Sequence, residues 1–203
     1  MNIRELRFAT ALCVMAIAAV TVLRGADVVA FRAATQNVSG DTRAEALRAW
    51  YPVPGVGTTA REMALPAALD FSNKDTLARQ RDTLADYLAV KPTASLQWLM
   101  LAASRLLLGE SKESVIAAYG LSVVTGPNEN DVMVERAKFG LYLWNDLPSE
   151  LKKREIDDLS LATIKDQDVE NIRKLLGFIS PASRDEILKA LPKPRQTFFA
   201  PQS

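Results

Sequence analysis

The sequence predicts an all-α protein, in which an N-terminal hydrophobic helix is followed by antiparallel helical hairpins that form either a solenoid or a bundle. Three observations carry this prediction. An uncharged apolar run opens the chain, helix caps and Gly or Pro breaks alternate through the rest, and no stretch of strand length alternates apolar with polar residues. Hydrophobic residues make up 48% and charged residues 24% of the 203 positions, which is the balance of a protein with a packed core.

The first element, residues 1–31, is expected to be a membrane anchor or a signal sequence. Residues 8–23 (FATALCVMAIAAVTVL) carry no charge, and Arg4 and Arg7 precede them, which is typical of segments whose basic flank stays in the cytoplasm. A helix of that length spans about 24 Å, less than the ~30 Å hydrocarbon core. In one interpretation the small residues at 28–30 mark a cleavage site. In the other, which we favour, the helix continues uncleaved through that site.

The remaining elements follow from caps and breaks. A small polar linker at 32–40 precedes a helical domain at 41–191, and residues 192–203 are expected to form a flexible tail. Within the domain the signals predict helices at about 41–50, 59–69, 73–90, 93–108, 111–124, 130–145, 148–161, 168–178 and 181–191. Ser72 and Ser111 are the expected N-caps of two of them, and Gly109 ends another. Short connections between helices of similar length favour antiparallel neighbours.

The helix expected at 93–108 is apolar on more than one face, so we expect it at the centre of the domain. This helix and the next also carry a repeat pattern: Trp98, Leu101, Tyr119, Ser122 and Pro127 occupy its Trp, Leu, aromatic, small and closing Pro positions, with Gly109 in the turn. The pattern resembles that of tetratricopeptide repeats over roughly residues 73–146, although Arg105 replaces the first aromatic. The resemblance implies a concave groove for a peptide or partner helix, and protein binding rather than a reaction. A generic antiparallel bundle is the alternative.

The composition excludes several kinds of chemistry. The chain has no histidine, and its one cysteine, Cys13, lies in the apolar run, so histidine-dependent nucleophiles and the usual zinc or iron sites cannot be assembled. No phosphate-binding glycine pattern occurs, and the residues beyond position 30 carry equal numbers of basic and acidic side chains. We therefore predict no catalytic residue, no metal, no small-molecule cofactor and no nucleic-acid partner.

The densest charge lies in residues 149–159 (SELKKREIDDL). Glu150 with Arg154, and Lys153 with Asp157, are spaced i,i+4, so we interpret this run as a solvated helix face.

The leading hypothesis is a membrane-tethered, extracytoplasmic helical scaffold in a cell-envelope complex, with secretion and polysaccharide export as settings. Its partners would be the membrane, through the N-terminal helix, and another envelope protein or peptide. We expect a single pass through a bacterial-type inner membrane with the body in the periplasm, or secretion if the N-terminal segment is cleaved. The candidate partner-binding residues are Trp50 and Tyr51, beside a proline loop, and Phe198 and Phe199, in a tail that either frays or docks.

The alternative hypothesis is a carboxylate-dependent envelope enzyme such as a lytic glycosidase. It requires two carboxylates about 5–9.5 Å apart in one cleft.

Overall fold

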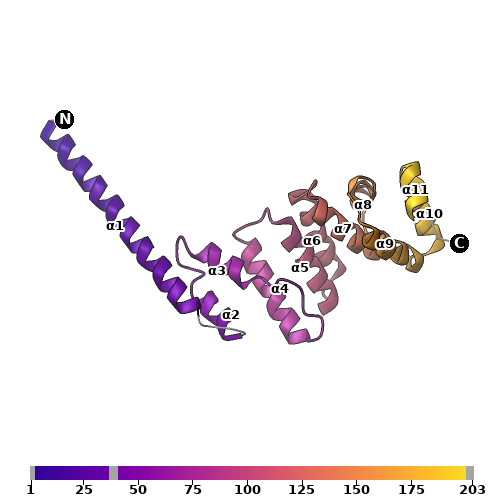
Figure 1. Cartoon of the computed structure of the whole chain (residues 1–203), viewed down its shortest axis with the longest axis horizontal. Coiled ribbons are helices and arrows are strands. Elements are labelled where there is room, and N and C mark those ends of the chain that lie inside the picture. Colours follow the sequence, from indigo (N-terminus) through magenta and orange to yellow (C-terminus); the bar gives the residue numbers. More distant parts are fainter. Residues whose placement is uncertain (1–2, 37–40, 200–203) are drawn as a thin grey trace. The chain divides into compact units, whose positions relative to one another are not determined.

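The computed structural model describes residues 3–36 and 41–199, and every regular element in those residues is a helix (Figure 1). The all-α prediction is therefore confirmed. The chain divides into two compact units, with the boundary after Ala67. This division differs from the single helical domain expected at 41–191, because the first two helices of that range group with the N-terminal helix.

Unit 1 holds α1 (Ile3–Thr35), α2 (Asp41–Arg48) and α3 (Gly57–Ala64). Helix α1 extends through residues 32–35 of the expected linker, and residues 37–40 of that linker lie outside the described residues. The three helices share a small hydrophobic core that we call the unit 1 core. It consists of buried Phe31, Leu47, Val56 and Ala60, with half-buried Trp50, Tyr51, Val53 and Ala64 packed against them.

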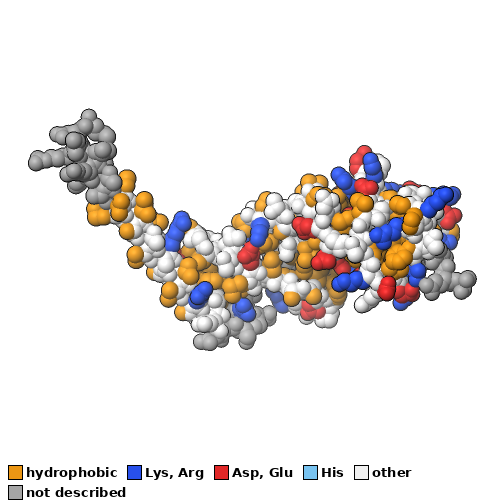
Figure 2. All heavy atoms as spheres, turned by 45° about the horizontal axis from the view of Figure 1, so that its top comes forward, with side chains coloured by type: hydrophobic (Ala, Val, Ile, Leu, Met, Phe, Trp, Pro, Cys, Tyr) orange, Lys and Arg blue, Asp and Glu red, His pale blue; other side chains and the backbone are white. Residues whose placement is uncertain are grey.

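Helix α1 contains the only segment, among the described residues, that is long and apolar enough to cross a membrane. This segment is Cys13–Thr35, with a mean hydropathy of 1.9, and only 6% of its apolar window is buried. Figure 2 shows apolar side chains along the described length of α1 with no other part of unit 1 covering most of them. By length and composition, α1 is a candidate membrane anchor or signal sequence.

Unit 2 is built from helices joined by short connections. They are α4 (Lys74–Leu88), α5 (Ser95–Leu108), α6 (Lys112–Thr125), α7 (Asn130–Leu143), the 3-10 turn η1 (Trp144–Asp146), α8 (Ser149–Leu161), α9 (Asp166–Phe178), α10 (Pro181–Ala190) and α11 (Lys193–Phe199). Helix α5 contacts α4, α6 and α7, and α7 contacts α8 and α9. Helix α5 is therefore packed against three other helices, as expected of a central helix. It is not buried on every face, because Leu96 and Leu107 are 41% and 53% exposed.

Most helix ends follow the local sequence, but α3 spans Gly57–Ala64 rather than the expected 59–69, and the cap of α4 also differs. Ser111 caps α6 as expected, by accepting a hydrogen bond from the backbone N–H of Ser114 at 3.3 Å. Helix α4 is capped by Asn73 rather than by Ser72, because the Ser72 hydroxyl is engaged as a donor to Asp70 at 2.6 Å. Gly109 ends α5 with a φ of 75°, in the left-handed region that favours glycine.

The expectation of a flexible tail over 192–203 is wrong for residues 193–199, which form α11. Phe199 is 2% exposed and belongs to a hydrophobic core cluster of unit 2, together with residues from α7, α8, α9 and α10. The Arg173 guanidinium donates to the Phe198 carbonyl from Nε at 3.0 Å and from Nη2 at 2.7 Å. Burial of an aromatic ring and satisfaction of a helix-end carbonyl stabilise this last helix. Residues 200–203 lie outside the described residues.

Candidate partner-binding surface

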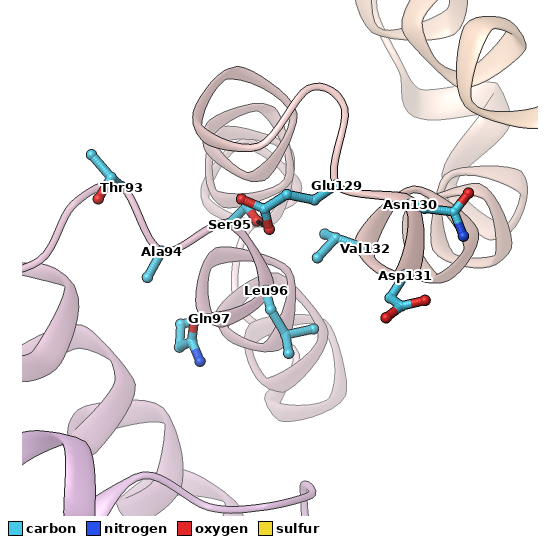
Figure 3. Close-up of a pocket in the computed structure, with 9 residues that line it drawn as sticks. All are labelled: Thr93, Ala94, Ser95, Leu96, Gln97, Glu129, Asn130, Asp131 and Val132. Carbon is cyan, nitrogen blue, oxygen red and sulfur yellow. Dashed lines mark hydrogen bonds between the residues drawn. The ribbon is translucent and has the colours of Figure 1, made fainter. Parts of the chain in front are cut away.

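A hollow of about 550 Å³ opens where α5 and α7 begin (Figure 3). Its lining residues come from two segments close to the helix N-termini, 93–97 and 129–132. The two segments approach closely because position 126 is glycine: a Cβ there would lie 2.5 Å from the Ser95 Cβ. The Ser95 hydroxyl then donates to Glu129 Oε2 at 2.5 Å, which fixes the start of α5 against the start of α7.

A second hollow, of about 340 Å³, continues the first toward the start of α9. Both hollows share Leu96, Asn130, Asp131 and Val132, and the second adds residues from α7 and from the segment before and within α9. We call the two hollows together the groove. Asn130 fixes the start of α7 against the segment before α9. Its side chain accepts a hydrogen bond from the Thr163 N–H at 2.6 Å and donates one to the Thr163 carbonyl at 3.3 Å.

The groove combines an apolar floor with acidic walls. Leu96 is its exposed apolar side chain, and carboxylates surround it on Glu129, Asp131, Glu135 and Asp168, with Lys165 as the one basic residue of the lining. Outside the lining, Lys138 bridges Glu135 at 2.6 Å and Asp168 at 3.2 Å. Burial alone would lower the pKa of Lys138. The hydrogen bonds to these two carboxylates have the larger combined effect, so the Lys138 pKa is raised.

Asp131 differs from the other acids of the groove. It is exposed, and within the part of the chain that the structure describes its side chain has neither the ion pair that Glu135 and Asp168 make with Lys138 nor the hydrogen bond that Glu129 accepts from Ser95. A segment that carries an apolar side chain and a neighbouring Lys or Arg therefore fits the groove, since the apolar group can cover Leu96 and the cation can pair with Asp131.

A separate polar network lies buried among α6, α7 and α8. Tyr119 Oη donates to Glu155 Oε2 at 2.7 Å, and both side chains are fully buried. Burial raises the pKa of Glu155 well above its ordinary value even though the Tyr119 hydroxyl donates to it, because a low-dielectric interior penalises the charged carboxylate more than the neutral carboxyl. Gly140 makes room for the carboxyl: a Cβ at this position would lie 2.5 Å from Glu155 Cδ and 2.6 Å from Tyr119 Oη.

Arg136 forms the other half of this network. Its side chain is fully buried, and it donates to Asp158 from Nε at 2.8 Å and from Nη2 at 3.1 Å. Nη1 donates to the backbone carbonyls of Ser122 at 3.2 Å and Gly126 at 2.8 Å. The pair therefore ties α7 to α8 and to the end of α6.

The network corrects our interpretation of residues 149–159 as a solvated face. Glu155 and Asp158 of this run point inward, and the exposed ion pair in it is Arg154–Asp157 at 3.9 Å, spaced i,i+3. A carboxylate enzyme would need such perturbed acids in a cleft. Neither Glu155 nor Asp158 lines the groove, so a substrate there would not reach them.

The four residues singled out from the sequence lie in different units. Trp50 and Tyr51 belong to the unit 1 core, where Trp50 packs edge-on against Phe31 at 5.5 Å between ring centroids. The Arg61 guanidinium lies 4.6 Å from the centre of the Tyr51 ring and donates to the Tyr51 carbonyl at 3.0 Å. In unit 2, Phe198 and Phe199 contact each other on α11, and Phe199 faces the core.

Sequence reasoning missed the groove. Its signal was the run of polar and acidic residues at 128–131, directly after Gly126-Pro127, which places carboxylates at a helix start. The structure adds what that run could not show, namely that exposed Leu96 lies beside it.

The fold and these surfaces define an all-α protein with an N-terminal apolar helix, a core next to that helix and a grooved helical unit. No model of a known protein family, no curated protein and no solved structure matches the chain.

Proposed function

We propose that this protein is a membrane-anchored helical adaptor, held by α1 in a bacterial-type inner membrane, whose groove binds a segment of another envelope protein in the periplasm. Secretion and polysaccharide export are settings that would use such an adaptor. The observation that carries the proposal is α1, which leaves its apolar side chains uncovered and then enters the unit 1 core through Phe31. An uncovered apolar helix of this length is stable in lipid and unfavourable in water.

The continuity of α1 supports an anchor rather than a cleaved signal. The helix runs without a break through residues 28–30, where the cleavage site would lie, and Phe31 and Thr35 just beyond are 5% and 7% exposed. Cleavage there would require unwinding a helix next to a packed core. Arg4 and Arg7 precede the apolar run, which favours a cytoplasmic N-terminus and a body on the other side.

Two sets of spacings in unit 2 support the proposal of a binding role. Helices α5, α7 and α9 begin at Ser95, Asn130 and Asp166, and the side-chain pairs Ser95–Glu129 and Lys112–Asp146 each join residues 34 positions apart. A period near 34 is that of tetratricopeptide repeats, and stacked repeats bind partners along the helices that begin each hairpin. The groove lies at the start of these helices.

Site-specific photocross-linking in membranes tests the adaptor role. A benzoylphenylalanine at position 96, in the groove, should form a discrete cross-linked species, and the same probe at exposed Lys153 should not. Asp131→Lys should weaken the cross-link, because it reverses the unpaired charge. Glu113→Lys is the matched control, since it makes the same charge change at the start of α6, the other end of the α5–α6 hairpin. Equal cross-linking at positions 96 and 153, or no effect of Asp131→Lys, would refute the groove as the binding surface.

A further inference from the structure

The unit 1 core is fused to the apolar helix. Phe31 and Thr35, in the last turns of α1, are buried, and Phe31 contacts Trp50. The helix therefore passes from its uncovered segment into the packed core with no linker. Wherever α1 lies in a bilayer, the height of the core above that bilayer is fixed by the length of helix between them.

That height can be worked out from helix geometry. The uncharged run begins at Phe8, just after Arg7 and before the segment Cys13–Thr35. A hydrocarbon core of ~30 Å takes about 20 residues at ~1.5 Å each, so a span that starts at Phe8 ends near Asp27, and the last residues of Cys13–Thr35 lie beyond the hydrocarbon. Phe31 lies four residues further, or ~6 Å along the axis. The headgroup layer is ~5–8 Å thick on each side, so Phe31 and its partner Trp50 lie within it.

The residues at this height have the chemistry of a lipid interface. Trp50 and Tyr51 are the aromatic types that concentrate where hydrocarbon meets headgroups, and both residues are half-buried, although the Tyr51 hydroxyl itself is buried. Exposed Arg32 and Arg48 lie in the last turns of α1 and α2 and can pair with phosphates. Met63 of α3 is 39% exposed and adds apolar surface.

We propose that the unit 1 core is an interfacial seat that places Trp50 and Tyr51 in the outer headgroup layer of the bilayer that α1 crosses, with phospholipid rather than a protein as their partner. This inference rests on the proposed function, because it requires α1 to span. It assigns the Trp50–Tyr51 pair to the lipid surface and leaves the groove of unit 2 for the protein partner.

Depth-dependent fluorescence quenching tests the seat. The full chain with Trp98→Phe and Trp144→Phe, which keeps Trp50 alone, is reconstituted in phosphatidylcholine vesicles brominated at acyl positions 6,7 or 11,12. Trp50 fluorescence should be quenched at least twofold more by the shallow bromines than by the deep ones. The matched control, Trp50→Phe with Trp98→Phe, keeps Trp144 alone, whose 2% exposure keeps bromines out of contact wherever unit 2 lies, and should show no quenching by either lipid.

Trp144 is 2% exposed, so its replacement can unfold unit 2. A second comparison therefore uses the unaltered chain and Trp50→Phe, and the quenched part of the emission should disappear in the variant.

Cys13, the chain's one cysteine, separates failure of the seat from failure of the anchor. In the same vesicles it should resist a membrane-impermeant maleimide until detergent is added. If Cys13 is protected but Trp50 is not quenched, the interfacial placement of Trp50 is wrong while α1 still spans the membrane, and Trp50 then faces water or protein. Reactive Cys13 with unquenched Trp50 overturns both.

Discussion

The buried Arg136–Asp158 pair makes a strong prediction for a double-mutant cycle. Arg136 donates two hydrogen bonds to Asp158 and one each to the carbonyls of Ser122 and Gly126, and its side chain is fully buried. Arg136→Met removes all of them and leaves the Asp158 carboxylate buried without its counter-ion. Loss of one partner of a buried pair costs about 3–5 kcal/mol of unfolding free energy, so this variant should lose about that much.

Asp158→Leu should lose a similar amount, because it leaves the Arg136 guanidinium buried and unpaired. The double variant should be much more stable than the sum of the two losses predicts, since it removes both charges from the interior, and such replacements are often neutral or better. The two carbonyls keep their backbone donors, Gly126 for Ser122 and Glu129 for Gly126. We expect a coupling free energy of about 2 kcal/mol or more.

The assay is urea denaturation of the full chain in detergent micelles, followed by circular dichroism at 222 nm. A change in midpoint at constant m-value reports stability alone. If the two single losses add in the double variant to within about 0.5 kcal/mol, the pair is not coupled and our account of the interior of unit 2 is wrong.

Three further predictions concern glycine, pH and lipid. Gly140→Ala should lower the unfolding free energy by about 1–3 kcal/mol, because its Cβ would overlap Glu155, whereas Gly177→Ala in α9, whose Cβ meets nothing within 4 Å, should be neutral or stabilise by up to about 1 kcal/mol; equal effects in denaturation would contradict this. Burial raises the pKa of Glu155, so the stability that its protonated form contributes is present below the carboxyl's ordinary pKa and lost as pH rises through the raised one. Denaturation midpoints of the wild type should therefore fall with rising pH across that window, and those of Glu155→Gln should fall less; parallel profiles would exclude a titrating Glu155. Ile17→Asp places a charge within the uncovered segment of α1 and should raise the free energy of membrane insertion by about 2.5–3.5 kcal/mol. Carbonate should therefore extract more of this variant from membranes than of Ile17→Leu.

Most helix boundaries could be predicted because their signals are local. Ser111 caps α6 and Gly109 ends α5, and the observed ranges of these helices lie within two residues of the expected ones. A cap or a left-handed glycine acts through its own backbone, so neither depends on what packs nearby.

The parts that could not be predicted depend on distant residues. Residues 193–199 look like a tail until Phe199 meets a core assembled from α7 to α10, and Glu155 looks like a surface acid until Gly140 and Tyr119 are placed beside it. The groove has the same origin, because Leu96 and Asp131 are far apart in sequence. Helical periodicity identifies a charged face, but only the neighbouring helices decide which charges are enclosed.

Because α1 continues without a break into the unit 1 core, it also fixes the rotational orientation of that core about the axis of the helix. Each residue of an α-helix turns the chain by about 100°, so one extra residue between Leu23 and Phe31 would swing the core about 100° around the axis and lift it ~1.5 Å. Seven extra residues would nearly restore the azimuth while lifting the core by ~10 Å. The side of the unit 1 core that faces a given direction is therefore set by the rotation of the membrane-spanning helix about its axis. Because the helix is continuous, the core cannot turn independently of that segment.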